Sequence, residues 1–280
     1  EDGYGAVEFQ DVSYTYPGAA SPALSHVSFR LEPGKKIAVV GMNGSGKTTM
    51  VKLLCRLYDP DDGRVMLNGR NVREYDYEEY LSQFSVVFQD FQLLALPLGE
   101  NVAGGKDYDA ARVRDCLEKA GFGKRLQRMK DGLSTFLYRN MDQDGVEIPG
   151  GEAQKIALAR ALYKDAPIVV LDEPTAALDP VSEHEVYSGF RNLVGGRTAI
   201  FISHRLSSCR FCDEILVFHQ GQLVQRGSHE ELVKEEEGLY ASMWRAQAQY
   251  YEQDGAFVKQ PCSTDSPSCE LLSYMLTLKQ

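Results

Sequence analysis

The chain has 280 residues, of which 43% are apolar and 25% are charged, and its formal net charge is −10. This length and composition are typical of a folded protein with one large domain or two small ones. The acidic balance gives no support to a nucleic-acid partner, and no apolar run approaches the roughly 20 residues that span a bilayer.

The chain begins with Glu1, without a signal peptide or an initiator methionine, so we expect it to be a piece of a longer protein. Its six cysteines do not read as a disulfide framework in a chain of this size, which indicates a reducing compartment. Cys209 and Cys212 have C-x-x-C spacing, but no second cysteine or histidine pair stands at zinc-site distance. Between a metal or redox role and a small buried apolar residue, we favour the second for Cys212.

The N-terminal region is predicted to be rich in β-strands. Apolar and polar residues alternate in "AVEFQDVSYTYPG" and in "HVSFRL", and "KIAVV" is a short apolar run typical of a buried strand. After Lys47, apolar residues at helical spacing predict an amphipathic helix. The segments "GRVMLNG" and "FSVVFQ" predict two further strands.

The second half of the chain is predicted to alternate strands and helices. Residues 91–143 have a mostly helical pattern, and three apolar runs then follow at helix-length intervals: "IVVLDE", "TAIFISH" and "ILVFH". This alternation predicts a parallel sheet covered by helices, while "HQGQ" predicts a turn after which "LVQRG" returns antiparallel. Residues 252–280 are rich in Ser, Pro, Cys and Gln and are expected to form a C-terminal tail.

The segment "GMNGSGKTT" fits the pattern G-x-x-x-x-G-K-[ST] between a buried strand and an amphipathic helix, which is the context this motif requires. Glycines at 41, 44 and 46 let the backbone wrap so that its N–H groups point at a β-phosphate. The helix N-terminus adds partial positive charge. Lys47 is expected to reach the β- and γ-phosphates, and the Thr48 hydroxyl to bind Mg²⁺. The sequence therefore predicts a nucleoside triphosphate site.

Two acids follow the apolar run in "PIVVLDEP". We expect this strand beside the phosphate loop, with the Asp172 carboxylate at its end holding Mg²⁺. Neighbouring residues on a strand point to opposite faces, so the strand must end here if Glu173 is to serve the same site. Glu173 is then placed to act as general base for the attacking water. The alternative for Glu173 is a salt bridge or a solvated strand end.

Two further polar residues stand where predicted strands end, Gln89 in "VVFQD" and His204 in "TAIFISH", and Asp179 in "AALDP" follows shortly after Glu173. The carboxyl ends of parallel strands are where an open α/β sheet binds its ligands. Together with "PGGEAQKIALARAL" these motifs resemble, in their order, the nucleotide-binding domain of ATP-binding cassette (ABC) transporters, over roughly residues 6–250.

The resemblance implies an α/β fold of the P-loop NTPase type: a RecA-like parallel sheet core, an antiparallel β subdomain and an α-helical signature subdomain. It implies an ABC ATPase domain over residues 1–251, with the β subdomain at about 6–35 and 62–88 and the helical subdomain at about 91–150. Within this fold, Tyr16 would stack on the adenine, in preference to Tyr14, because the family aromatic usually stands just before "PG". Gln89 and His204 would sense the γ-phosphate.

By the same resemblance, the predicted ATP-binding residues are Tyr16, Gly41, Asn43, Gly44, Ser45, Gly46, Lys47, Thr48, Thr49, Gly150 and Gly151. The predicted Mg²⁺ ligands are Thr48, Gln89 and Asp172, and the predicted catalytic residues are Glu173, His204 and Gln89.

The signature loop is unusual. The family pattern is L-S-G-G-Q, and two domains pair head to tail so that each signature closes on the ATP held by the other. This chain has "IPGGE", which keeps Gly150 and Gly151 but places Pro149 at the serine position and Glu152 at the glutamine position. Proline has neither a hydroxyl nor an N–H, so donors to the partner's phosphate are lost. The alternative is that the proline only begins a helix.

The sequence between the motifs is most similar to that of the exporter branch, in which membrane helices precede this domain. We therefore expect the motor domain of an exporter at the cytoplasmic face of a membrane, with a fused transmembrane domain and a second ABC domain, from a different chain, as partners. No nucleic-acid partner is expected. The alternatives are the ATPase subunit of an importer, a non-transport ABC ATPase, and a catalytically silent nucleotide sensor, which intact Glu173 and His204 argue against.

Overall fold

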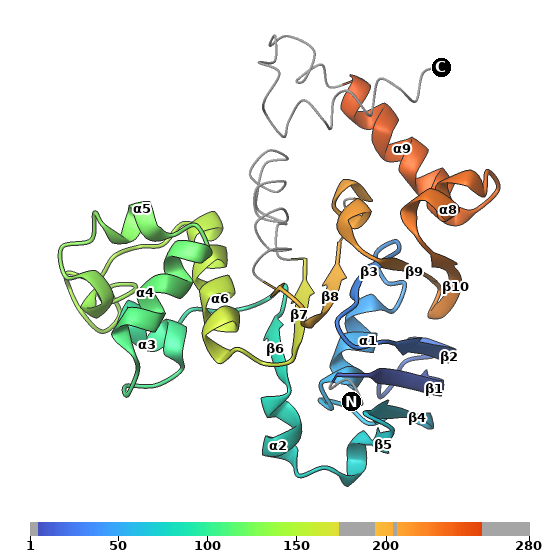
Figure 1. Cartoon of the computed structure of the whole chain (residues 1–280), viewed down its shortest axis with the longest axis horizontal. Coiled ribbons are helices and arrows are strands. Elements are labelled where there is room, and N and C mark those ends of the chain that lie inside the picture. Colours follow the sequence, from blue (N-terminus) through green and yellow to red (C-terminus); the bar gives the residue numbers. More distant parts are fainter. Residues whose placement is uncertain (1–4, 174–193, 204–205, 254–280) are drawn as a thin grey trace.

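The computed structural model describes residues 5–173, 194–203 and 206–253. Within these ranges the chain forms an antiparallel sheet, a larger mainly parallel sheet, and a helical lobe (Figure 1). No helix among the described residues is both long and apolar enough to cross a bilayer.

The antiparallel sheet has the strand order β2-β1-β4-β5. Period-two alternation of apolar residues, which the sequence predicted, is clear in β2, where every apolar side chain is buried and the polar ones between them are more exposed. Phe9 and Phe29 stack across β1 and β2 with ring centroids 4.6 Å apart. The bounds are β1 Val7–Tyr14, β2 Leu24–Leu31, β4 Asp62–Leu67 and β5 Arg70–Asn71.

The larger sheet has the order β10-β9-β3-β8-β7-β6. All neighbouring strands from β9 to β6 run parallel, and β10 pairs antiparallel with β9. Both the parallel core and the antiparallel return were predicted, and both are confirmed. The bounds are β3 Lys36–Val40, β6 Phe84–Val87, β7 Ile168–Asp172, β8 Thr198–Ile202, β9 Glu214–His219 and β10 Gln222–Gly227.

One expectation about this sheet is corrected. The range 62–88 assigned β6 to the β subdomain, but β6 pairs in parallel with β7, with Phe84 opposite Ile168, so the antiparallel part ends before Phe84. The error arose because the local pattern of a strand shows that it is buried but not which strand it pairs with. The strand that ends at Asp172 was expected beside the phosphate loop; β8 lies between it and β3, and Asp172 comes close to Thr48 and Lys47 of the loop.

The helical lobe lies beside β6, at the left of Figure 1. Its apolar core joins α3, α4, η2 and the inner face of α6, and continues onto one face of the parallel sheet at β6, β7 and β8. The stretch predicted to be mostly helical holds short helices with turns and extended segments between them, and the long signature helix follows it. The bounds are α3 Leu98–Ala103, α4 Ala110–Lys119, α5 Gly123–Leu126, η2 Gly132–Ser134 and α6 Gly150–Lys164.

The remaining helices cover the sheets. α1 buries Met50, Val51, Leu53 and Leu54 in the core that both sheets share. α8 and α9 pack on the β9 side of the core, and α9 reaches two residues into the range expected as tail. Residues 254–280 of that tail lie outside the described part. The bounds are α1 Lys47–Leu54, η1 Val72–Glu74, α2 Tyr77–Ser82, η3 Leu206–Phe211, α8 His229–Lys234 and α9 Leu239–Gln253.

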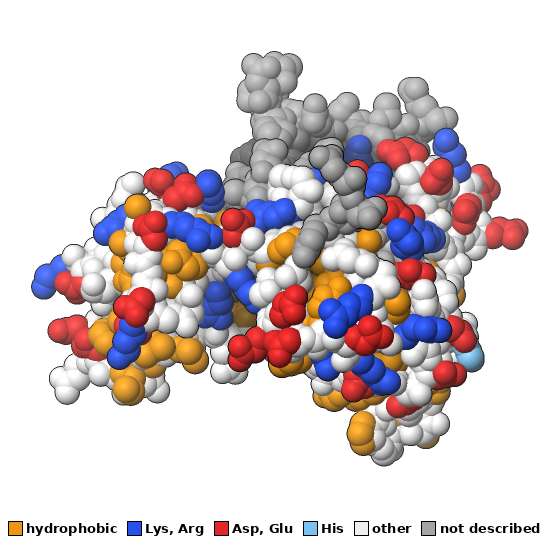
Figure 2. All heavy atoms as spheres, turned by 60° about the horizontal axis from the view of Figure 1, so that its bottom comes forward, with side chains coloured by type: hydrophobic (Ala, Val, Ile, Leu, Met, Phe, Trp, Pro, Cys, Tyr) orange, Lys and Arg blue, Asp and Glu red, His pale blue; other side chains and the backbone are white. Residues whose placement is uncertain are grey.

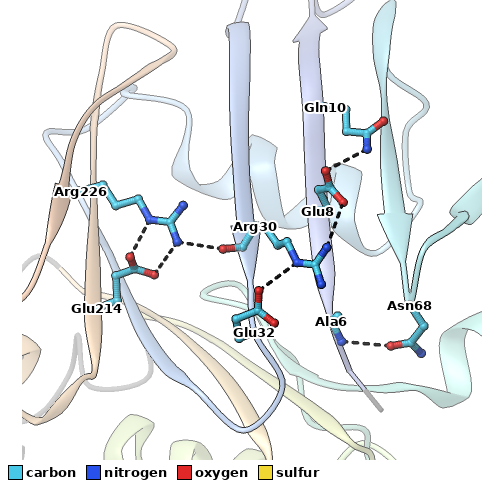
Figure 3. A network of polar contacts seen from close by, with 8 residues as sticks. All are labelled: Ala6, Glu8, Gln10, Arg30, Glu32, Asn68, Glu214 and Arg226. Atoms are coloured by element: carbon cyan, nitrogen blue, oxygen red, sulfur yellow. Dashed lines mark hydrogen bonds and ion pairs between the residues drawn. The ribbon is translucent and has the colours of Figure 1, made fainter. Parts of the chain in front are cut away.

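A polar network joins the edges of the two sheets (Figure 3). Arg226 on β10 donates to both carboxylate oxygens of Glu214, at 2.6 and 2.9 Å, and to the carbonyl oxygen of Arg30 on β2, at 2.9 Å. The Arg30 side chain in turn pairs with Glu32 at 2.9 Å. The contact from Arg226 to Arg30 ties the edge of the antiparallel sheet to the edge of the parallel one.

Candidate nucleotide site

The predicted phosphate loop connects β3 to α1, and Gly44 and Gly46 are two of the loop glycines that the backbone requires. Gly44 has φ +76° and Gly46 has φ +107°, a region that side chains with a Cβ disfavour. A Cβ on Gly46 would lie 2.6 Å from a methyl carbon of Leu24 and 2.8 Å from the carbonyl oxygen of Ala23, whereas one on Gly44 would meet nothing within 4 Å. Gly46 therefore lets the loop pack on β2, and Gly44 serves the turn alone.

Lys47, the first residue of α1, is buried and points back across the loop. Its Nζ donates to the carbonyl oxygens of Gly41 at 2.8 Å and Met42 at 3.1 Å. Burial lowers the pKa of Lys47, and the charges of Glu173 and Asp172 oppose that shift. The loop thus holds a cation at its centre, where a phosphate would place negative charge.

The other loop residues differ in exposure. Asn43 is exposed and Thr48 is half-buried, while Ser45 and Thr49 are buried. The Ser45 hydroxyl oxygen has no hydrogen-bond partner among the described residues. Its backbone is held by Gly221 of the β9–β10 turn, whose N–H donates to the Ser45 carbonyl at 3.1 Å. Nothing in the sequence pattern places that turn against the loop.

Tyr16 lies beside the start of α1. Its hydroxyl is 3.2 Å from the Thr49 hydroxyl, and its ring meets Tyr14 and Tyr58 at steep angles, with centroids 5.1 and 5.6 Å away. Tyr16 is half-buried, whereas Tyr14 is only 5% exposed and belongs to the core. Of the two tyrosines, Tyr16 is therefore the one with ring surface left for a ligand.

Asp172 ends β7 as a buried carboxylate, 1% exposed. Neither of its oxygens has a hydrogen-bond partner at ordinary geometry among the described residues. Burial raises its pKa to about 6, although the nearby Thr48 hydroxyl and Lys47 ammonium act in the opposite direction. Two unpaired, desolvated carboxylate oxygens near a threonine hydroxyl fit a hard divalent cation such as Mg²⁺, which takes oxygen ligands.

Glu173 does not continue the strand. Its φ is +50°, and its N–H donates to the carbonyl of Ile202 on β8 at 3.0 Å. Because this left-handed conformation interrupts the strand alternation, Glu173 need not point away from the face that Asp172 serves. The sequence argument that the strand must end here is confirmed. A non-glycine residue in this conformation costs about 1–2 kcal/mol, and such strain is concentrated at functional sites.

Gln89 follows β6 in an exposed turn. It lines a groove of about 490 Å³ between the parallel sheet and the helical lobe. Gln154 of α6 also lines it and is only 5% exposed, with an Oε1 that has no partner among the described residues. The groove brings together Gln89, Phe91, Gln92, Leu93, Tyr138, Ile148, Gly150, Ala153, Gln154 and Glu173.

α6 begins directly after the proline. Pro149 is the N-cap, with φ −61° and ψ 152° and no side-chain cap, and its carbonyl accepts from Ala153 at 2.9 Å. The N–H groups of Gly150, Gly151 and Glu152 therefore stand in the first turn, where an α-helix offers no internal acceptor. This is the arrangement that binds anions at helix N-termini.

The structure thus brings the phosphate loop, Tyr16 and the two acids to one side of the sheet, and Gln89 to the groove beside Glu173. Gly150 and Gly151 lie on the lobe, at the other side of that groove. His204 and residues 177–179 lie outside the described residues. Sequence reasoning did not single out Arg125, whose Nε lies 3.3 Å from Oε2 of Glu152.

Comparisons with known proteins agree with the motif order. A family model described as "ABC transporter" matches residues 24–176. The chain is 44% identical over 252 residues to an ATP-dependent lipid A-core flippase of Burkholderia orbicola, covering 90% of this chain and 41% of that protein. It is 41% identical over 245 residues to the flippase of the same name from Vibrio vulnificus, covering 87% and 41%.

Among solved structures, a bacterial Atm1-family ABC exporter with ATP bound is similar, with a TM-score of 0.80 and 35% sequence identity. The match covers 88% of this chain and 42% of that one. The chain therefore spans about two fifths of the length of the relatives that it matches.

Proposed function

The chain belongs to the ABC transporter family, in which it corresponds to the nucleotide-binding domain with the α/β fold of P-loop NTPases, and from this premise we propose that it is the ATP-hydrolysing motor of an exporter. The observation that carries the proposal is the end of β7, where the buried Asp172 carboxylate and Glu173 stand near Lys47 of the phosphate loop. In this arrangement the Lys47 ammonium can bind a triphosphate, the Asp172 carboxylate can hold a divalent cation, and Glu173 can activate water.

The proposed mechanism assigns each residue one task. The loop N–H groups and Lys47 hold the phosphates, and Lys47 exchanges its two loop carbonyls for phosphate oxygens. Thr48, Asp172 and Gln89 would hold Mg²⁺, which supplies charge neutralisation of the phosphates when bound. Glu173 accepts a proton from a water molecule while the oxygen of that water attacks the γ-phosphorus. The bond between the γ-phosphorus and the leaving oxygen of ADP breaks.

Glu173→Gln tests the enzymatic part. The variant should bind ATP as the parent does but turn over about 10²–10⁴-fold more slowly, because that is the usual contribution of a general base. Turnover is measured as phosphate release, and binding with a fluorescent ATP analogue. Lys47→Ala is the contrasting variant and should lose binding. An unchanged rate for Glu173→Gln removes Glu173 from the mechanism.

For the assembly we propose a head-to-tail pair with a different ABC domain. Support comes from the first turn of α6, where Gly150 and Gly151 offer N–H groups but Pro149 offers none and has no capping side chain. Two copies of this chain would place a proline in both ATP sites. In a heterodimer, the hydrogen-bond donors missing at Pro149 are missing only at the ATP held by the partner. The ATP held by this chain, at Lys47, Asp172 and Glu173, then meets a partner signature that has serine at this position.

Mixing tests this assembly. The ATPase rate of the chain alone should be low and should rise when a partner domain with serine at the matching position is added. Pro149→Ser should also raise the rate of the chain alone, since one hydrogen bond to a charged group contributes about 1.5–3 kcal/mol, or tenfold and more. High cooperative turnover by the unmodified chain, insensitive to this substitution, means that Pro149 only begins the helix.

We propose that the domain lies at the cytoplasmic face of a membrane and that its helical lobe contacts a transmembrane domain of the same transporter. Figure 2 shows hydrophobic side chains gathered on the lobe at its left, among charged ones. Leu94 and Met141, both in the segment 91–143, are 57% and 72% exposed. In the assembled transporter, cysteines at these two positions should cross-link to the membrane domain. Labelling of both by a bulk-solvent reagent at the full rate would contradict the assignment. An importer subunit is the alternative, distinguished by whether membrane helices are fused to this domain.

A further inference from the structure

The first turn of α6 cannot form a capping box. In a capping box, the acid at the third helical position accepts a hydrogen bond from the N-cap N–H. α8 shows this arrangement complete, with Glu231 accepting from the Ser228 N–H at 2.8 Å. In α6 the acid at the third position is Glu152, but the N-cap is Pro149, which has no N–H. The Glu152 carboxylate must therefore find a partner elsewhere.

That partner is Arg125, on the neighbouring helix α5. Its Nε lies 3.3 Å from Oε2 of Glu152. The two side chains are 38% and 30% exposed, but the two facing atoms are shielded from solvent and lie at ion-pair distance without hydrogen-bond geometry. A pair that meets in a shielded contact interacts more strongly than one that is fully hydrated. Removing the arginine would leave a half-buried negative charge next to Gly151.

The location of this charge matters because of what the first turn of α6 is proposed to meet. Gly150 and Gly151 offer their N–H groups to the triphosphate held by the partner domain, and Glu152 adds a carboxylate to that same turn. An uncompensated carboxylate here would repel the triphosphate and cancel the partial positive charge of the helix end.

We propose that Arg125 is a positioning residue for ATP-dependent pairing: it neutralises the Glu152 carboxylate and holds it away from the phosphate-facing N–H groups of α6. This inference rests on the proposed function, specifically on closure of α6 over a partner's ATP. Arg125 acts through Glu152 and touches no nucleotide.

The test uses the full chain carrying Glu173→Gln, so that ATP is bound but not consumed. Self-association is followed by sedimentation velocity as MgATP is increased. Arg125→Ala should raise the ATP concentration for half-maximal association about tenfold, as expected for an uncompensated charge a few ångströms from a phosphate. Adding Glu152→Gln should return it to within about twofold, and Arg125→Lys, which keeps the charge, should retain most of the association. The matched control is Arg128→Ala, which removes the same charge from an exposed position three residues on.

Two further readouts separate positioning from a merely structural contact. The affinity of the isolated chain for a fluorescent ATP analogue reports its own phosphate loop, and should be equal in all variants because Arg125 acts on the partner's nucleotide. The penalty of Arg125→Ala should shrink as salt is raised, because the repulsion is screened over about 10 Å at 0.1 M.

The failures are distinguishable. Absence of MgATP-dependent association in the parent, also after Pro149→Ser is added, refutes pairing through α6 and this inference with it. Association that Arg125→Ala leaves unchanged, or that Arg128→Ala weakens equally, refutes the role of Arg125 alone. A loss of thermal stability and of own-loop ATP affinity in proportion to the loss of association identifies a structural pair, and also overturns the inference.

Discussion

Substituting alanine at Gly46 and at Gly44 should have very different effects, although both belong to the same motif. At Gly44 the new Cβ meets nothing within 4 Å, so the cost is only that of holding φ +76°, about 1–2 kcal/mol. At Gly46 the Cβ would lie 2.6 Å from Leu24 and 2.8 Å from the carbonyl oxygen of Ala23, at φ +107°. Overpacking adds about 1–3 kcal/mol to a backbone cost of about 1–3 kcal/mol, so we expect roughly 2–6 kcal/mol in total.

Thermal unfolding of the nucleotide-free chain measures the difference. With about 2–4 °C per kcal/mol for a domain of this size, the midpoints of about 4 and 1.5 kcal/mol correspond to a loss in Tm of about 8–16 °C for Gly46→Ala and of about 3–6 °C for Gly44→Ala. Gly105→Ala is the control, because Gly105 has an ordinary φ and open space around its Cβ position. Equal losses for the two loop variants would refute the argument that Gly46 is required by its contact with β2.

Three other predictions concern the site and its support. Asp172→Asn should abolish the Mg²⁺-dependent part of ATP affinity while leaving metal-free binding within about twofold, as measured by titration with and without a chelator, because the amide removes the charge that would hold the cation. Tyr16→Ala should weaken ATP binding by the roughly 1–3 kcal/mol of a stacking contact, whereas Tyr16→Phe should keep most of it; equal losses would assign the effect to the hydroxyl. The pKa of His229 is lowered by burial first and by Arg210 second, so the folded chain resists its protonation. Stability should therefore fall as pH drops below the usual histidine pKa of about 6.5, and this fall should be smaller in His229→Gln; identical pH profiles would exclude His229 as the cause.

The sequence alone was enough to predict where most of the candidate site lies along the chain. The phosphate loop could be placed because its residues are contiguous and its flanking strand and helix have distinct periodicities. The end of β7 could be placed because two acids after an apolar run serve one site only if the strand stops there, and Glu173 has the left-handed backbone that this required. The order of the motifs along the chain was enough to indicate the family that the comparisons then showed.

Only the tertiary structure decided which segments meet. Strand order placed β8 between β3 and β7, and β6 in the parallel sheet, because pairing depends on crossover connections that leave no trace in the pattern of a single strand. The contact of Gly46 with Leu24, and the ion pair between Arg125 and Glu152, join residues of different elements. Contiguous motifs are readable because backbone geometry fixes them locally. Contacts such as these depend on how whole elements pack, which no single segment of the sequence specifies.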